Sequence, residues 1–128
     1  MLNHNTLECT TEQEYELHTN RELLKAVLRN LVDNANKHTH NGTIHIHCKR
    51  DNDTTCSICV SDTGDGISPE SLIKIKNLIK SAETVSDFDS GDRLGYQLII
   101  DFANRLNAHV TIDSEEDKGT AVFISELV

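Results

Sequence analysis

The chain has 128 residues, enough for one hydrophobic core but too few for two domains. Twelve basic and 21 acidic residues give a formal net charge of -9, and aromatic residues make up 4% with no Trp, so a nucleic-acid-binding surface is disfavoured. If the ligand is an anion, we therefore expect a divalent cation to accompany it. The sequence contains neither an apolar run of about 18 residues nor a signal-peptide pattern, which predicts a cytoplasmic chain without direct membrane contact and with four reduced cysteines.

Two parts are expected along the chain. Residues 1–18 are polar and predict a tail or an edge strand, with weak alternation only over residues 14–18. The domain proper is expected over residues 19–128. It opens with Thr19 and Glu22 spaced as a capping box, which predicts a helix from Thr19 to about His38.

The following segments predict alternating strands and helices. Residues 43–62 alternate twice around a polar turn and predict a β-hairpin, and Ser68 followed by Pro69 predicts the start of a second helix. The polar, aperiodic stretch 81–93 predicts a lid, residues 94–108 a third helix, and residues 109–127 a closing hairpin. This order predicts an α+β fold, a two-layer sandwich with three helices on one face of a mixed, mostly antiparallel sheet.

The first helix carries a polar stripe beside its apolar face. Asn30, Asn34, Lys37 and His38 share this stripe, and Asn is a poor helix former. An amide oxygen is a suitable ligand for Mg²⁺, and a lysine one turn later can meet a phosphate. The stripe is therefore a candidate metal and phosphate site, the alternative being an ordinary solvated helix face.

Two glycine-containing stretches provide further candidates. In "DTGDG", Gly64 and Gly66 let a flat ligand approach the main chain, and Asp62 offers a carboxylate to an exocyclic amine such as that of adenine. In "SGDRLGYQLI", Gly91 and Gly95 bracket a helix start that can hold phosphate. Each stretch taken alone also fits a plain turn or helix entry.

In this order, "NLVDNANKHT", "DTGDGI", "GDRLGY" and "GTAVF" resemble the four nucleotide-binding boxes of the ATP-binding catalytic domain of bacterial sensor histidine kinases. That family belongs to the superfamily that includes DNA gyrase and heat-shock chaperone ATPases. The resemblance extends from about Asn20 to the end of the chain. It implies that ATP lies between the first helix and the lid, with Mg²⁺ on Asn34 and phosphate near Lys37.

The resemblance also implies roles for the other residues of the boxes. Asp62 would hold the adenine amine, and Thr120 would support the same end of the ligand. The remaining nucleotide-binding positions would be His38, Gly64, Gly66, Ile67, Gly91, Arg93, Leu94 and Gly95. The implied partners are the dimerisation and histidine phosphotransfer domain of the same receptor and a response regulator downstream.

Three departures refine this expectation. At the position of Asn30, ATP-hydrolysing members and anti-sigma-factor serine kinases resemble one another in carrying a glutamate that acts as general base. Asn30 cannot accept a proton. A histidine acceptor is already a nucleophile and needs no such base, so this position favours transfer to a histidine. Arg93 replaces a glycine and is a candidate contact for the γ-phosphate. No histidine sits in the helical hairpin that carries the phosphoacceptor in such kinases, so we expect a catalytic piece of a longer sensor that does not phosphorylate itself. The alternatives are a degenerate interaction module of the same fold and a stand-alone serine kinase of the anti-sigma-factor type.

Histidines and cysteines also raise the possibility of a zinc site. The residues concerned are His38, His40, His45, His47, Cys48, Cys56 and Cys59. Strand alternation would place His45 and His47 opposite Cys48, and Cys56 opposite Cys59, so we do not expect a zinc centre.

Overall fold

The computed structural model describes residues 4–11, 18–81 and 91–128, which form five strands and three helices. The elements are β1 (Thr6–Thr11), α1 (Arg21–His38), β2 (Thr43–Arg50), β3 (Cys56–Asp62), α2 (Pro69–Ser81), α3 (Gly91–Arg105), β4 (His109–Glu115) and β5 (Gly119–Leu127).

The strands form one mixed sheet in the order β1-β2-β3-β5-β4. β1 runs parallel to β2, and the other three pairs are antiparallel. Pairing of β3 with β5 places Asp62 opposite Thr120. Two candidate site residues far apart in the sequence therefore lie side by side at one end of the sheet.

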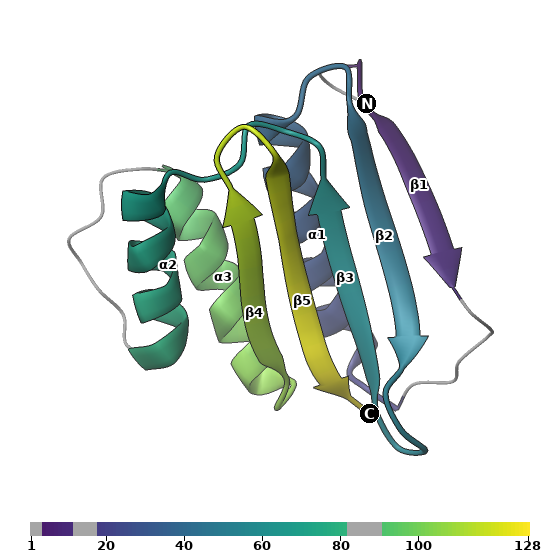
Figure 1. Cartoon of the computed structure of the whole chain (residues 1–128). Helices are drawn as coiled ribbons and strands as arrows, with labels where there is room; N and C mark the ends of the chain where they lie inside the picture. Colours follow the sequence, from purple (N-terminus) through teal and green to yellow (C-terminus); the bar gives the residue numbers. More distant parts are fainter. Residues whose placement is uncertain (1–3, 12–17, 82–90) are drawn as a thin grey trace.

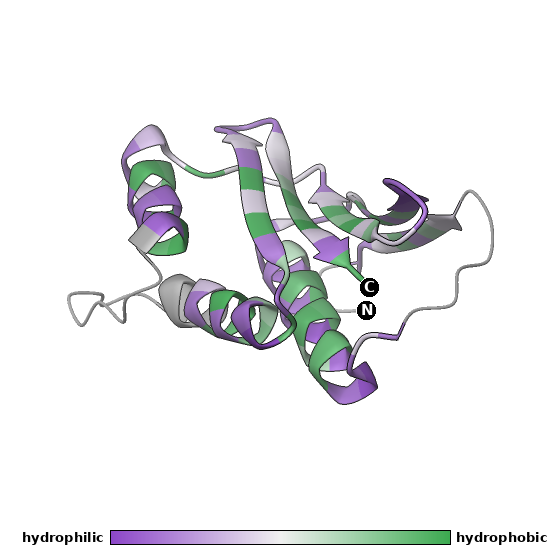
Figure 2. Cartoon of the chain, turned by 90° about the horizontal axis from the view of Figure 1, so that it is seen from below, coloured by the Kyte–Doolittle hydropathy of each residue, from purple (hydrophilic) through white to green (hydrophobic). Residues whose placement is uncertain are grey.

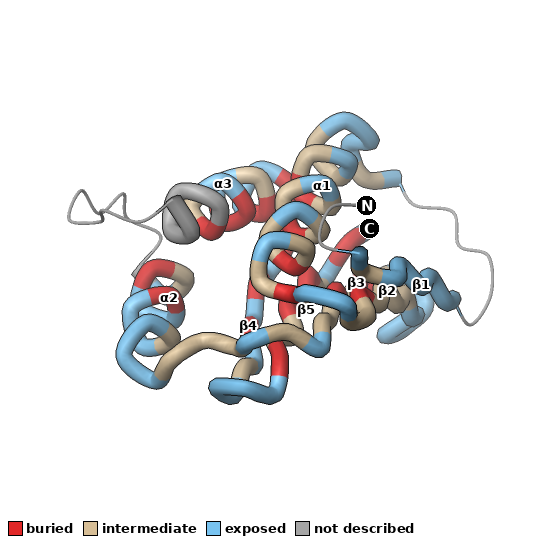
Figure 3. The backbone as a smooth tube through the Cα atoms, turned by 90° about the horizontal axis from the view of Figure 1, so that it is seen from above, coloured by how far each residue is buried: buried red, intermediate tan, exposed pale blue. Residues whose placement is uncertain are grey.

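The three helices cover one face of this sheet (Figures 1 and 3). α1 packs against α3 and β3, whereas α2 packs against β4. Hydrophobic and hydrophilic positions alternate along the strands (Figure 2), as expected for a sheet with one covered face. The predicted α+β sandwich is confirmed. Its core includes the fully buried residues Val27, Ile44, Ile99, Ala103, Ile124 and Leu127.

The N-cap of the first helix lies one residue later than predicted. Its N-cap is Asn20, whose side-chain oxygen accepts hydrogen bonds from the main-chain N–H groups of Glu22 (3.0 Å) and Leu23 (3.1 Å). The prediction of Thr19 as the cap is wrong, because the Thr19 hydroxyl donates instead to the carbonyl oxygen of Val128. This contact joins the entrance of the helix to the end of the chain.

The second helix starts as predicted, with Pro69 as its first residue and the Ser68 hydroxyl accepting from the main-chain N–H of Ser71 (3.3 Å). The predicted lid over residues 81–93 overlaps two helices, because Ser81 belongs to α2 and α3 already begins at Gly91. The rest of that lid, including Phe88, lies outside the described residues.

The N-terminal segment contributes β1, an edge strand exposed along its whole length. Most of the alternating stretch 14–18 lies outside the described residues. All four cysteines are free thiols, of which Cys56 is buried and Cys9 exposed. Within the described ranges, no helix combines the length and apolar character needed to cross a membrane.

Candidate functional site

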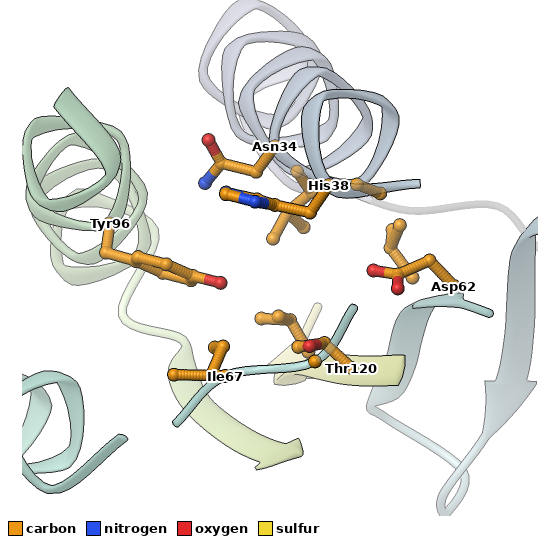
Figure 4. Close-up of a pocket in the computed structure, with 11 residues that line it drawn as sticks. Asn34, His38, Asp62, Ile67, Tyr96 and Thr120 are labelled. Carbon is orange, nitrogen blue, oxygen red and sulfur yellow. The ribbon is translucent and has the colours of Figure 1, made fainter. Parts of the chain in front are cut away.

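A pocket lies between α1, α3 and the ends of β3 and β5 (Figure 4). Counting the solvent at its mouth, its volume is about 350 Å³. Apolar side chains form much of its wall, and polar groups converge from separate segments of the chain. Its lining residues are Leu31, Asn34, Ala35, His38, Val60, Asp62, Gly66, Ile67, Tyr96, Thr120 and Val122.

Asp62 is the acidic residue of this pocket and ends β3. Its Oδ1 accepts a hydrogen bond of 2.9 Å from the main-chain N–H of Gly64. Burial raises the pKa of the Asp62 carboxyl above its ordinary value. The nearby Gly64 and Thr120 N–H groups, the Thr39 hydroxyl and the His38 side chain oppose this rise without cancelling it. The carboxylate is thus held in a fixed orientation in a partly desolvated place.

The loop after β3 is tied to the end of α1. The main-chain N–H of Asp65 donates to the carbonyl oxygen of His38 (3.0 Å). A Cβ at Gly64 would collide with that same carbonyl and lie 2.5 Å from the Thr39 hydroxyl oxygen. Gly64 is therefore required where the protein main chain approaches itself, in addition to any approach of a ligand.

Gly66 lies on the other side of the same loop. Its φ is +70°, and a Cβ there would collide with the carbonyl oxygen of Glu115, at the end of β4. The main-chain N–H of Asp117 also donates to the carbonyl oxygen of Asp65 (2.6 Å). Both contacts attach the loop to the β4–β5 turn, so the loop bridges the two sides of the pocket.

Ser114 on β4 joins these pieces through one hydroxyl group. Its Oγ accepts from the main-chain N–H of Ile67 (2.9 Å), donates to the carbonyl oxygen of Gly119 (3.0 Å) and lies 2.8 Å from the Thr120 hydroxyl. Ile67 and Thr120, which line the pocket, are therefore positioned by a residue that does not line it.

Nδ2 of Asn34 is a buried polar atom without a hydrogen-bond partner in the part of the chain that the structure describes. Asn34 lines the pocket from α1, and Thr39 lies next to Asp62. Amide nitrogen and oxygen are nearly isosteric, so a half-turn of the Asn34 amide would present oxygen at the same point. A buried group of this kind normally has a partner, so the Asn34 amide fits a site that a polar ligand or metal completes.

The predicted polar stripe of α1 is divided between two environments. Asn34 and His38 line the pocket, whereas Lys37 is exposed and Asn30 donates to the carbonyl oxygen of Ala26 (2.8 Å) within its own helix. Four further candidates, Gly91, Arg93, Leu94 and Gly95, lie in the first turns of α3. The backbone there is helical, so Arg93 does not stand in a turn.

Two of the histidines considered for zinc, His45 and His47, lie on the open face of the sheet, whereas His38 lines the pocket at the end of α1. His45 and His47, on β2, both place a ring nitrogen within hydrogen-bond distance of the Thr10 hydroxyl on β1, at 2.8 and 2.9 Å. Cys59 lies in the same shallow depression, whereas Cys48 packs against the core on the other face. These contacts attach the edge strand to its neighbour.

The pocket, the glycine loop and the sheet order can be compared with known proteins. The model of the family described as histidine kinase-, DNA gyrase B- and HSP90-like ATPases matches residues 19–127. The chain belongs to this family. Two of its relatives are named histidine protein kinases. The histidine protein kinase DivJ of Caulobacter vibrioides is 33% identical over 111 residues, and SaeS of Staphylococcus aureus is 31% identical over 109 residues.

These relatives are longer proteins. The match with DivJ covers 87% of this chain but 19% of DivJ, and the match with SaeS covers 82% of this chain but 31% of SaeS. Among solved structures, the catalytic domain of the histidine kinase ThkA superposes with a TM-score of 0.73 at 23% identity, covering 97% of this chain and 80% of that one. Full-length ShkA in complex with AMPPNP gives a TM-score of 0.76 at 18% identity, covering 95% of this chain and 25% of that one. The ATPase-family domain thus has the fold of histidine kinase catalytic domains.

Three residues near the site were missed by sequence reasoning: Thr39, Tyr96 and Ser114. Thr39 follows the asparagine-rich helix and is fully buried, which its polar surroundings in the sequence do not indicate. Tyr96 is the last residue of the stretch "GDRLGY". That position is the signal that could have identified it, although the rotation of α3 that turns it into the pocket is not visible locally.

Proposed function

We propose that this chain is the ATP-binding catalytic domain of a sensor histidine kinase, which delivers the γ-phosphoryl group of ATP to a histidine on a separate helical-hairpin domain. The observation that carries the proposal is the single pocket in which Asn34 and His38 of α1, Asp62 of β3, the glycine loop and Thr120 of β5 converge. The acceptor histidine belongs to the dimerisation and phosphotransfer domain of the same receptor, and a response regulator receives the phosphoryl group downstream. The domain works on the cytoplasmic side of the membrane.

The Asp62 end of the pocket suits an adenine base. An ionised carboxylate is only an acceptor, so Asp62 accepts a hydrogen bond from the exocyclic amine of the base. The apolar side chains of Leu31, Ile67 and Val122 provide walls for the flat ring. Thr120 supports this end of the ligand, positioned by its contact with Ser114. Gly64 and Gly66 let the loop approach the end of α1 and the end of β4 closely.

The Asn34 end suits the phosphates and their metal ion. Nδ2 of Asn34 has no partner among the described residues, so the amide can turn and offer its oxygen to Mg²⁺, a hard cation that takes oxygen ligands, some of them from phosphate. When bound, Mg²⁺ neutralises charge on the phosphates. Lys37, on the exposed side of the same helical turn, and Arg93, in the first turn of α3, supply cationic groups for the same purpose. Gly91, Leu94 and Gly95 lie in the first turns of the 15-residue helix α3, whose positive end would stabilise the phosphates.

Transfer to histidine requires little acid–base chemistry from this domain. A neutral imidazole is already a nucleophile, so the domain positions the γ-phosphoryl group and stabilises its charge. Asn30 has no basic oxygen, and its amide is bonded to the carbonyl oxygen of Ala26. This arrangement favours histidine over serine as the acceptor.

The proposal is tested by comparing the affinities of the chain for two nucleotides that differ in their base. We expect the chain to bind ATP with Mg²⁺, and to bind inosine triphosphate, which has a carbonyl in place of the adenine amine, at least about tenfold more weakly, a difference of about 1.4 kcal/mol. Isothermal titration calorimetry measures both affinities. The variant Asp62→Ala is expected to lose the discrimination, and Asp113→Ala, which removes an exposed carboxylate from β4, to keep it. Equal affinity of the unsubstituted chain for both nucleotides would contradict the assignment of Asp62.

A further inference from the structure

Tyr96 lies inside the pocket that the proposed function assigns to the nucleotide. It is the lining residue that α3 contributes, and it has the largest side chain of the eleven. Only 6% of Tyr96 is exposed. Figure 4 shows its ring extending from α3 across the pocket, with the hydroxyl oxygen directed toward the side of Asp62 and Thr120.

The pocket is narrow for the ligand that it is proposed to hold. Without the solvent at its mouth, the space inside it that can hold the centre of a water molecule is about 20 Å³, whereas ligand pockets have volumes of about 300–1,000 Å³. Figure 4 shows the His38 ring on the α1 side of the pocket, next to Asn34, and the Tyr96 ring on the α3 side. Both rings border the pocket in which Asp62 lies.

We propose that the Tyr96 ring occupies part of the nucleotide site in the ligand-free domain and turns out of it when the nucleotide binds, so that Tyr96 sets the affinity. The inference rests on the proposed function. It identifies one side chain as a competitor of the ligand within the same site.

The movement of the Tyr96 ring out of the pocket is a switch between two side-chain rotamers. On a helix, an aromatic side chain occupies one of two χ1 rotamers, because the third collides with the preceding turn. The inward rotamer buries the ring in the hydrophobic core cluster that also contains Leu31 and Val122. Leaving this position exposes apolar surface, which favours the inward rotamer in the absence of ligand. The apparent affinity is then lower than the intrinsic one by the fraction of molecules whose ring is turned out.

Two substitutions separate the bulk of the ring from its hydroxyl. Tyr96→Leu removes the ring and keeps an apolar side chain, and Tyr96→Phe keeps the ring and removes the hydroxyl. We expect the dissociation constant for ADP with Mg²⁺ to fall at least about fivefold in Tyr96→Leu and to stay within about twofold in Tyr96→Phe. An unchanged or weaker affinity of Tyr96→Leu would overturn the proposal.

A second measurement follows the ring itself in the unsubstituted site. The chain has no Trp and two Tyr, Tyr15 and Tyr96, so in the variant Tyr15→Phe the tyrosine fluorescence comes from Tyr96 alone. We expect Mg²⁺ with ADP to increase the quenching of this fluorescence by acrylamide, because the ring moves toward solvent. Unchanged or reduced quenching at saturating ADP would overturn the proposal, and this readout does not depend on how well Tyr96→Leu folds.

The two measurements distinguish the failure of this inference from failure of the proposed function. Binding of ADP by the unsubstituted chain without improvement in Tyr96→Leu rejects the role of Tyr96 and leaves the nucleotide site standing. Binding of ADP by Tyr96→Leu alone supports the proposal that the Tyr96 ring competes with the nucleotide. If circular dichroism shows that the unsubstituted chain and both variants are folded, and none of them binds ADP at millimolar concentration, the nucleotide site and the role of Tyr96 are rejected together.

Discussion

The carbonyl oxygen of His38 accepts a hydrogen bond of 3.0 Å from the main-chain N–H of Asp65, which fastens the loop after β3 to the end of α1. Gly64 makes this approach possible, because a Cβ there would collide with the same carbonyl oxygen. The fold of this loop therefore depends on the absence of a side chain at Gly64. The relation can be tested by substitution.

We expect Gly64→Ala to lower the free energy of unfolding by about 1–3 kcal/mol, as overpacking against main-chain atoms does. Urea denaturation followed by circular dichroism measures the change. Asp65→Ala is the matched control, since it removes an exposed side chain from the next residue and keeps the main-chain hydrogen bond. Equal stability of Gly64→Ala and Asp65→Ala would show that the loop has room that the structure does not indicate.

The raised pKa of Asp62 predicts a pH dependence of stability. Because burial raises the folded pKa above the unfolded value of about 3.9, the folded chain binds this proton more tightly than the unfolded chain. The group therefore contributes stability below about pH 3.9, and this contribution is lost as the pH rises through the folded pKa.

The comparison that isolates this effect is with Asp62→Asn, which does not titrate. We expect the free energy of unfolding of the unsubstituted chain, minus that of Asp62→Asn, to decrease as the pH rises from about 3.9 through the folded pKa. Urea titrations without nucleotide at several pH values give the difference. A difference that increases with pH over this window would mean that the folded pKa lies below the unfolded one.

Ser114 offers a test of how the loop after β3 is held against the β4–β5 turn. Removing its hydroxyl leaves the Ile67 N–H without its acceptor, so Ser114→Ala is expected to lower the free energy of unfolding by about 1–3 kcal/mol. Hydrogen exchange at the Ile67 amide should become faster than in the unsubstituted chain. Ser125→Ala, on the neighbouring strand, serves as the control. Unchanged exchange at Ile67 would show that another group takes over the hydrogen bond.

The order of elements was predictable because their signals are local. The spacing of apolar residues identified α1, and the pair Ser68 and Pro69 marked the start of α2. The glycine loop and Asp62 were also identified from their neighbours in the sequence. These features depend on residues within one or two turns of each other.

The parts that sequence reasoning missed depend on contacts between distant segments. Thr19 and Asn20 can both cap a helix, and the choice was decided by the Val128 carbonyl, which engages the Thr19 hydroxyl. Ser114 follows the alternation of an ordinary strand residue, and only the pairing of β4 with β5 brings it to the glycine loop. Tyr96 enters the pocket through the packing of α3 on α1, which has no local signature.

The measurement that tests the central claim most directly is the melting temperature of the chain with and without Mg²⁺ and ATP, compared with Asn34→Ala. A ligand that binds only the folded state raises the melting temperature by mass action. We expect a rise that requires Mg²⁺, that is lost in Asn34→Ala, and that persists in Asn30→Ala, whose amide bonds to its own helix. No rise at millimolar ATP, or an equal rise in Asn34→Ala, would contradict the assignment of this pocket as a metal-dependent ATP site.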